Sequence, residues 1–224
     1  MAVRFKRKSA EDWENEEVNE AKADKRFGKK SGRIMIPTSH DLTPANKDIA
    51  IQIIQGLLKV GNDILIVTKP RMDVVKDICD ALFDYQDRIL FRFTIGSADS
   101  DILRFWEPNA TGFSERLECL KMAYAMGYET SVSCEPMLDT NPDAVVKKVQ
   151  KYVSESIWLG KPNFLMTRIK QNGYSEGSET WIKAKELIES QDDQFILDLV
   201  KRFESNEKIK WKESIVKVQN EYIE

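Results

Sequence analysis

The sequence predicts an α/β fold in which about five or six parallel β/α units form a partial (β/α) barrel of the TIM-barrel type. Three observations lead to this fold class. Short apolar runs of strand length recur along the chain, and segments with helical periodicity separate them. The runs are apolar throughout rather than alternating, which is typical of a parallel sheet buried on both faces.

Length and composition set the frame for this prediction. A chain of 224 residues can bury one substantial core, and 42% hydrophobic with 32% charged residues is ordinary for a soluble protein. The net charge of −3 gives no general attraction to nucleic acid. The sequence has no membrane-spanning run, no signal peptide and only three widely spaced cysteines, so we expect a cytoplasmic protein.

The chain divides into a charged segment, residues 1–32, and a barrel domain, residues 33–224. Residues 11–25 are compatible with a helix that has little to bury, and the apolar pattern begins at Arg33. Thr43 and Pro44 predict the start of the first helix of the barrel, which ends at Gly61. We expect strands at 33–37, 63–69, 88–94, 129–134 and 156–160, and helices at 44–61, 72–85, 100–106, 114–126 and 142–152.

The last part of the chain is less regular. Residues 179–203 predict a long helix or a pair of helices on the outside of the sheet, because apolar positions recur near helical spacing. Residues 210–218 fit a terminal strand or a helix equally well. The sequence contains no Gly-x-Gly-x-x-Gly, no Walker phosphate loop and no short repeat, so it lacks the signatures of the common nucleotide-binding folds.

Polar residues follow the predicted strands, where barrel folds place their sites. The cations Lys69 and Arg92 stand among apolar neighbours, where an uncompensated charge is costly, and an anionic ligand group is a natural partner. The alternative is that these residues cap the helices that follow. The residues concerned are Thr38, Ser39, His40, Asp41, Thr68, Lys69, Arg92, Thr94, Ser133, Cys134 and Glu135.

The sequence predicts no metal site. His40 is the only histidine, so neither a catalytic triad nor a site with several histidine ligands can be built from this chain. Cys79 and Cys119 occupy apolar helical positions, where burial is the default, and Cys134 stands alone at a strand end.

Five segments, taken in order, resemble radical S-adenosylmethionine (SAM) proteins of the spore photoproduct lyase-like group. The likeness extends from residue 1 to about residue 160, and it includes a Glu-Pro turn at Glu107 that leads into the Arg116-bearing helix. The five segments are residues 34–41 (IMIPTSHD), 65–70 (LIVTKP), 91–96 (FRFTIG), 105–108 (FWEP) and 132–136 (VSCEP).

The resemblance implies that the chain binds SAM. By this resemblance Ser39 and Lys69 contact the amino acid moiety and Thr94 lines the same pocket. His40, Asp41, Arg92 and Glu135 are carried over less directly from neighbouring strand ends. The carboxylate of SAM suits a lysine, and its ammonium suits acidic or hydroxyl groups.

One large departure from the family stands out. Its C-x-x-x-C-x-x-C motif holds a [4Fe–4S] cluster, and this sequence has no such motif. The resemblance places the first barrel strand and the cluster loop upstream of Met1. We therefore expect the cluster only in a longer form of the protein. Three explanations for the missing motif remain open: a start codon assigned too late, a truncated or split chain, or a paralogue that lost the chemistry.

Three functions remain open at this point. The first is the body of a radical SAM enzyme that is inactive by itself. Its substrate is unknown, and the net charge of the chain gives no support to a nucleic-acid substrate. The second is a cluster-free binding or interaction protein, whose exposed sheet edge pairs with another copy or with a partner that supplies the cluster loop. The third is a metal-independent enzyme that uses Lys69 and Glu135 as acid–base groups.

Overall fold

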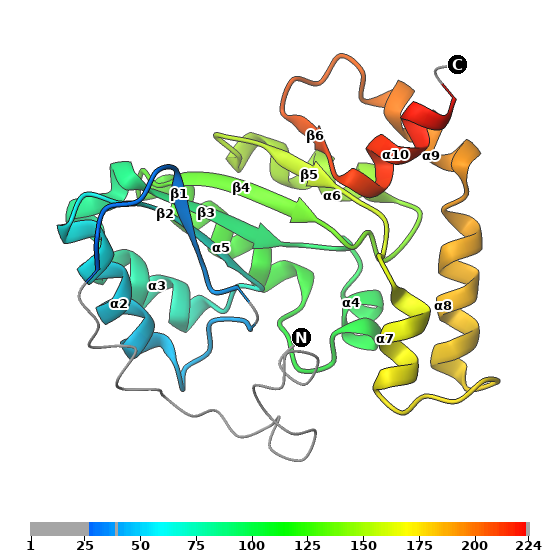
Figure 1. Cartoon of the computed structure of the whole chain (residues 1–224), viewed down its shortest axis with the longest axis horizontal. Helices are drawn as coiled ribbons and strands as arrows, with labels where there is room; N and C mark the ends of the chain where they lie inside the picture. The colour runs from blue at the N-terminus through cyan, green and yellow to red at the C-terminus, as the bar shows by residue number, and fades with distance from the viewer. Residues whose placement is uncertain (1–26, 39, 223–224) are drawn as a thin grey trace. The chain divides into compact units, whose positions relative to one another are not determined.

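The computed structural model describes residues 27–38 and 40–222 and has an α/β fold (Figure 1). The strand order is β1-β2-β3-β4-β5-β6, and the four strand pairs that lie within a compact unit are all parallel. The predicted α/β class with a parallel sheet is therefore confirmed. The predicted helix at 11–25 lies outside the described residues.

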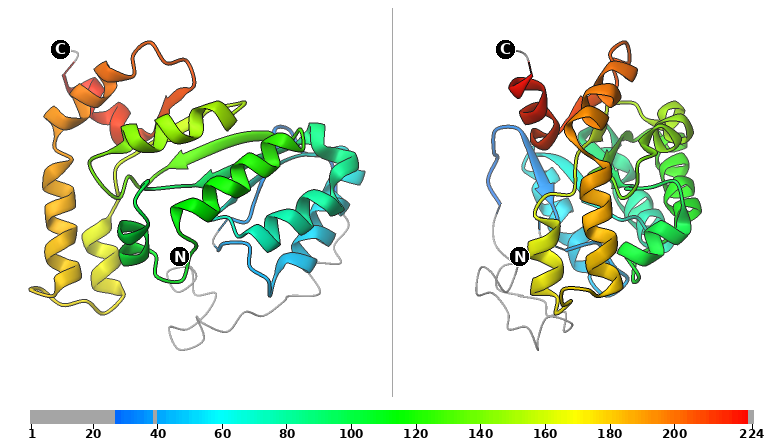
Figure 2. Two further views of the ribbon diagram at one scale, coloured as in Figure 1. Left: turned by 180° about the vertical axis from the view of Figure 1, so that it is seen from behind. Right: turned by 90° about the vertical axis from the view of Figure 1, so that its right-hand side faces the viewer.

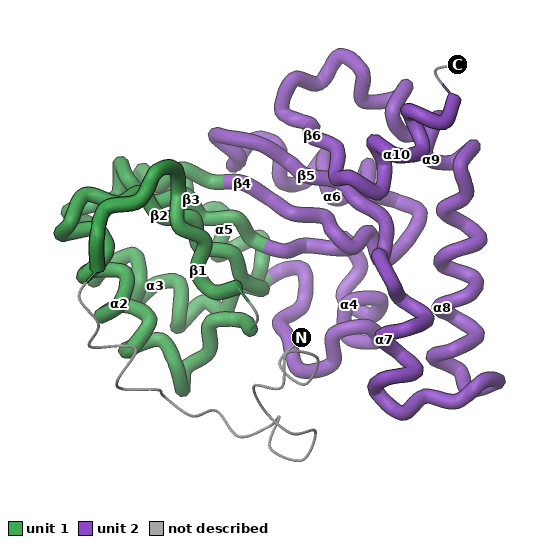
Figure 3. The backbone as a smooth tube through the Cα atoms, viewed as in Figure 1, with its two compact units in different colours: residues 1–93, 115–130 green, residues 94–114, 131–224 purple. Residues whose placement is uncertain are grey.

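The chain forms two compact units (Figure 3). Unit 1 contains the described residues up to Phe93 together with Glu115–Thr130, and unit 2 contains Thr94–Ser114 and Ser131–Tyr222. The prediction of a single domain over 33–224 stays a prediction.

Unit 1 repeats a strand–helix pattern. Its elements are β1 (Arg33–Ile36), α2 (Lys47–Lys59), β2 (Asp63–Thr68), α3 (Met72–Ala81), the 3₁₀ helix η1 (Phe83–Arg88), β3 (Ile89–Thr94) and α5 (Phe113–Ala125). In the parallel register Arg33 is opposite Asp63, and Ile64 is opposite Ile89. Right-handed crossovers between sequential parallel strands place the connecting helices on one face of the sheet, as Figures 1 and 2 show.

The two faces of the unit 1 strands differ in burial. Ile64, Ile66, Phe91 and Phe93 are fully buried, whereas Leu65, Val67 and Arg92 on the other face of the same strands are only partly buried. Leu90 is the exception on this second face, because it is only 1% exposed. Edge strand β1 has no buried residue, and Met35 on it is 45% exposed. The expectation that both faces are fully buried is therefore wrong for unit 1, because helices cover one face only.

Unit 2 contains the second set of parallel strands. Its elements are α4 (Ser100–Trp106), β4 (Glu129–Cys134, from Ser131 on), α6 (Pro142–Val149), the 3₁₀ turn η2 (Gln150–Tyr152), β5 (Ile157–Leu159), α7 (Leu165–Gln171), α8 (Glu179–Ser190), α9 (Asp193–Arg202), β6 (Ile209–Trp211) and α10 (Glu213–Glu221). Helices α7 and α8 run side by side in Figures 1 and 2.

Most element boundaries agree with the sequence, and the differences have local causes. Helix α2 begins at Lys47 instead of directly after Thr43, because Thr43 forms a turn in which its N–H donates to Asn46 Oδ1 at 2.9 Å. Gly61 follows α2 at φ +91°, a backbone angle that favours glycine. Residues 179–203 are a helix pair, separated where Asp192 caps α9.

The secondary structure of two regions could not be predicted from the sequence alone. Residues 210–218 are divided between the end of β6 and α10, so both readings of this segment hold in part. Helix α7 was not predicted at all. Within residues 27–38 and 40–222, no helix is long and apolar enough to cross a membrane.

Candidate functional site

The site candidate of unit 1 is an ion pair at the carboxyl ends of β1 and β2. Lys69 Nζ lies 3.0 Å from Asp41 Oδ2, with the lysine side chain 28% and the aspartate side chain 37% exposed. The Lys69 backbone N–H also donates to Asp41 Oδ1 at 2.8 Å. Lys69 directly follows β2, and Asp41 lies in the loop that follows β1. Parallel pairing of β1 with β2 places both residues at the same end of the two strands.

The hydroxyl group of Thr68 helps to position the Asp41–Lys69 pair through hydrogen bonds. Its hydroxyl is buried and accepts a hydrogen bond from the Leu42 N–H at 3.0 Å. The Thr68 Oγ1 also lies 3.4 Å from Asp41 Oδ1. The Asp41 carboxylate is thus held in one orientation by several donors, while both charged groups remain within reach of solvent.

Two further residues predicted for this site, His40 and Arg92, belong to unit 1. His40 is exposed, and Ser39 lies outside the described residues. Arg92 is in β3 opposite Val67, on the strand face away from the buried rings of Phe91 and Phe93. Strand alternation therefore places Arg92 on the less buried face, which the apolar sequence around it did not reveal.

A second polar cluster lies in unit 2, at the carboxyl ends of β4, β5 and β6. Glu135 Oε2 is 2.7 Å from Lys212 Nζ, with both side chains about a quarter exposed, at 26% and 28%. Asn163 Nδ2 is 3.4 Å from Glu135 Oε1, and Lys212 Nζ lies 5.3 Å from the centre of the Trp158 ring. Glu135 was predicted as a candidate, but Lys212, Asn163 and Trp158 were not.

Glycine at position 160 allows this close approach. A Cβ there would lie 2.8 Å from Lys212 Cβ and 3.0 Å from Glu135 Cγ. The strand ends are further tied by the Lys212 N–H, which donates to Leu159 O at 2.9 Å. The relative positions of Glu135 and Lys212 are therefore set by the β4–β5 and β5–β6 pairings. The β5–β6 contact joins segments more than fifty residues apart and has no local sequence signal.

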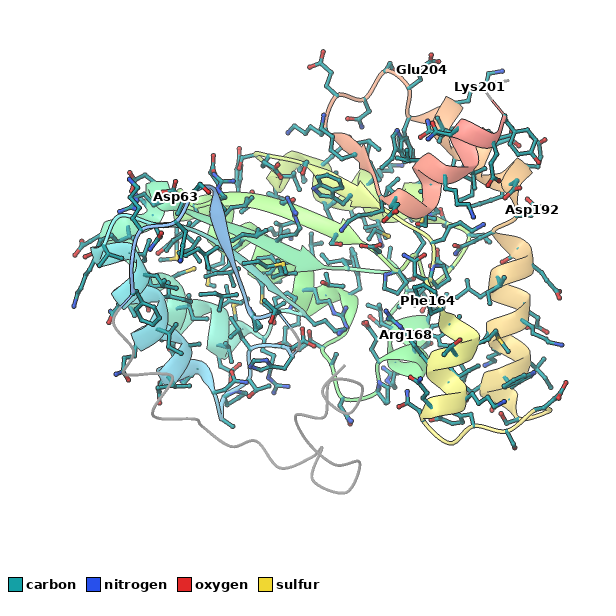
Figure 4. All side chains as sticks on the ribbon, in the orientation of Figure 1. Asp63, Phe164, Arg168, Asp192, Lys201 and Glu204 are labelled. Carbon is teal, nitrogen blue, oxygen red and sulfur yellow. The ribbon has the colours of Figure 1, made fainter. Side chains whose placement is uncertain are left out.

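Phe164, which follows Asn163, has an unusual backbone. It adopts the left-handed conformation (φ +56°, ψ 29°), and among the described residues it is the only non-glycine residue with positive φ. Its side chain is nevertheless 77% exposed (Figure 4). A bulky residue in this region costs about 1–3 kcal/mol and is held there by its surroundings, commonly at functional positions.

The seven residues predicted to bind SAM are thus divided between the units. Asp41 and Lys69 are in direct contact in unit 1, and His40 and Arg92 belong to the same unit. Glu135 contributes to the second cluster, and Thr94 is the last residue of β3, at the start of unit 2. Lys69 and Glu135, the alternative acid–base pair, each have an oppositely charged partner of their own.

The cysteines do not fit an iron–sulfur cluster. Cys79, Cys119 and Cys134 are free and fully buried on α3, α5 and β4. The burial of Cys79 and Cys119 and the strand position of Cys134 agree with the sequence prediction. Burial raises the pKa of the Cys79 and Cys119 thiols to about 12 each, and burial also raises the pKa of Cys134. Within the described part of the chain, no group of three histidine, cysteine or acidic residues could hold a metal ion.

These buried thiols predict that the protein loses stability at alkaline pH. A thiol whose pKa is raised in the folded state stays protonated there, while the same thiol ionises in the unfolded state. The contribution of these thiols to the free energy of unfolding is therefore fully present below about pH 8.5 and is lost as the pH rises toward 12. Burial raises the pKa of Tyr128 as well, and its hydroxyl donates to Cys79 O at 2.6 Å. Urea unfolding between pH 8 and pH 11 measures the slope, which we expect to be shallower in Cys79→Ala; an equal slope in both proteins would contradict this assignment.

The fold and the two clusters define an α/β protein with a parallel sheet and charged residues gathered at the carboxyl ends of its strands. Comparisons with protein-family models, with curated protein sequences and with solved structures gave no match. No relative therefore indicates a function for this chain.

Proposed function

We propose that this chain is the SAM-binding body of a radical SAM enzyme and that its cluster thiolates come from outside these 224 residues. The observation that carries the proposal is the Asp41–Lys69 pair. It presents one cation and one anion, 3.0 Å apart and reachable from solvent, at the carboxyl ends of parallel strands. An α-amino acid group carries the complementary pair of charges, and SAM contains such a group.

The roles of the two side chains follow from their chemistry. Lys69 binds the ligand carboxylate through a charge-assisted hydrogen bond, and Asp41 accepts from the ligand ammonium. The sequence resemblance to the spore photoproduct lyase-like group supports this assignment through Lys69 and its neighbours. A bound [4Fe–4S] cluster would supply the electron that cleaves SAM, but the residues of this chain do not fit one.

Calorimetric titration of the protein with SAM tests the proposal. Lys69→Gln removes a charge-assisted hydrogen bond, so we expect SAM to bind about 10- to 100-fold more weakly. S-adenosylhomocysteine, which keeps the amino acid group, should show the same loss, whereas 5′-methylthioadenosine, which lacks that group, should not respond to the substitution.

A matched control is Lys76→Gln. Lys76 pairs with Asp80 on the surface of α3, and both side chains are more than half exposed. This variant removes the same charge from unit 1 and should leave SAM binding unchanged. The proposal is wrong if the wild-type protein fails to bind SAM, or if Lys69→Gln binds it as tightly as the wild type.

The second candidate is a cluster-free binding protein, which the exposure of β1 favours. This strand pairs only with β2 among the described strands, and none of its residues is buried. An unprotected strand edge can pair with another chain. Analytical ultracentrifugation at several concentrations tests self-association, and Met35→Lys at the edge should weaken any dimer.

A further inference from the structure

We infer that Glu135 and Lys212 form a binding site for the charged groups of an α-amino acid at the carboxyl ends of the unit 2 strands. Both residues belong to unit 2, so this site stands without the proposed function, which assigns SAM to Asp41 and Lys69 in unit 1. Taken together with the proposed function, and resting on it in this respect, the site gives the substrate class as a molecule with a free amino acid group.

The side chains of the site share one face of the unit 2 sheet. In the parallel register Trp158 lies between Ser133 on β4 and Lys210 on β6. Glu135 and Lys212 come two positions after these neighbours, and strand alternation places them on the same face. The contacts agree, because Lys212 Nζ lies 2.7 Å from Glu135 Oε2 and 5.3 Å from the centre of the Trp158 ring.

Gly160 makes room for this pair. A Cβ at position 160 would lie 2.8 Å from Lys212 Cβ and 3.0 Å from Glu135 Cγ, closer than ordinary contacts. Gly160 is not among the glycines with positive φ, so the space and not the backbone angle requires glycine there. A solvent-accessible ion pair contributes little to stability by itself. The local packing therefore favours a contact that the fold hardly needs, which indicates another use for the pair.

The two charged groups have hydrogen-bonding capacity left for a ligand. The Lys212 ammonium has three donors and the Glu135 carboxylate about four acceptor sites, and the pair itself uses one of each. The side chains are 26% and 28% exposed, so both groups can be reached from solvent. An α-amino acid can place its carboxylate on Lys212 and its ammonium on Glu135. A ligand with one charge alone would be repelled by the like-charged member of the pair.

The strand ends hold the pair in place before a ligand arrives. The Lys212 N–H donates to Leu159 O at 2.9 Å, and the Lys161 N–H donates to Ser214 Oγ at 3.0 Å. The Trp158 ring lies close enough to the Lys212 ammonium for a cation–π contact, which restrains the flexible lysine side chain. Binding then requires little ordering of the protein.

Ligand-observed NMR with the common L-amino acids, each at about 10 mM, tests this inference. We expect at least one of them to bind the wild-type protein with a Kd on the order of 1 mM or tighter. Lys212→Gln and Glu135→Gln each remove a charge-assisted hydrogen bond, so each should weaken binding of that amino acid about 10-fold.

Blocked forms of the same amino acid separate ligand recognition from a structural effect. The amide lacks the carboxylate and the N-acetyl form lacks the ammonium, and each should bind the wild-type protein about 10-fold more weakly than the free amino acid. Lys212→Gln should no longer distinguish the amide from the free amino acid. Glu135→Gln should no longer distinguish the N-acetyl form. A structural effect would instead weaken all three ligands alike in both variants, and that result would reject the site.

The matched control is Lys217→Gln on α10 of the same unit. Lys217 Nζ lies 3.8 Å from Glu221 Oε1, and both side chains are more than half exposed. This variant removes the same charge and should leave amino acid binding unchanged. Stability gives a further readout: the double variant Glu135→Gln/Lys212→Gln should lose no more than about 4 °C in melting temperature, because the pair contributes little to the fold.

Four further results would overturn the inference. They are a wild-type protein that binds none of the amino acids, unchanged binding in Lys212→Gln, a larger fall in the melting temperature of the double variant, and SAM binding that weakens in Lys212→Gln. The last result would make this pair the SAM site. The two proposals also fail separately, since Lys69→Gln should weaken SAM binding and leave binding of the amino acid unchanged.

Discussion

Anaerobic reconstitution of residues 1–224 with iron and sulfide is expected to leave the protein without a [4Fe–4S] cluster and without reductive SAM cleavage. The three thiols that the chain contains are fully buried on a strand and two helices. A cluster needs thiolates on one loop or pocket, and burial raises the pKa of Cys79 and Cys119 to about 12.

Bringing these cysteines onto one cluster would require removing core elements. The cost is comparable to the whole free energy of unfolding, about 5–15 kcal/mol for a domain. Iron and sulfide analysis, visible absorbance and a 5′-deoxyadenosine assay with dithionite measure the outcome. A variant with all three cysteines replaced by serine controls for adventitious iron and should give the same low values.

The complementary experiment adds the missing motif. A chain extended at its N-terminus by a C-x-x-x-C-x-x-C segment is expected to load the cluster and to cleave SAM, and Lys69→Gln in that chain should impair cleavage. Stoichiometric loading and SAM cleavage by residues 1–224 alone would contradict both the cysteine assignment and the proposed function.

Replacement of Asn62 by alanine is expected to cause the largest loss of stability of any substitution considered. Asn62 is fully buried, and its side chain makes three hydrogen bonds. Oδ1 accepts from the Lys30 N–H at 2.7 Å, and Nδ2 lies 3.1 Å from both Gly28 O and Leu57 O. These bonds connect the end of α2 to the segment that leads into β1.

The alanine variant removes the side-chain partner of the Lys30 N–H and of Gly28 O, while Leu57 O keeps its bond from the backbone N–H of residue 62, and we expect this loss to cost about 2–4 kcal/mol. The melting temperature should fall by about 5–15 °C. Asn220→Ala on the exposed face of α10 is the matched control and should change the free energy of unfolding by no more than about 0.5 kcal/mol. A similar small effect at both positions would show that the three bonds contribute little.

Charged residues that come soon after a strand could be located from the sequence. Asp41 and Lys69 were both named because they come after apolar runs, and parallel pairing of β1 with β2 brings them into contact. Arg92 was also named, and it lies on the partly buried face of β3, opposite Val67. The apolar neighbours on either side in sequence lie on the other face of β3.

The second cluster was found only in part. Glu135 follows β4 and could be predicted, whereas Lys212 lies in a segment that fitted both strand and helix. Asn163 and Phe164 precede α7, a seven-residue helix that is too short to give a periodic signal. The positive φ of Phe164 has no sequence marker either, because glycine or asparagine is the residue that usually announces it.

The sequence by itself determined the α/β class, the parallel strands, most helices and the burial of Cys79 and Cys119, because hydrophobic periodicity and length are local properties of the chain. Only the tertiary structure decided which charged residues meet. The Asp41–Lys69 and Glu135–Lys212 pairs join residues 28 and 77 positions apart along the chain. Strand register and the close approach at Gly160 place them together, and these depend on packing between distant segments rather than on any local pattern.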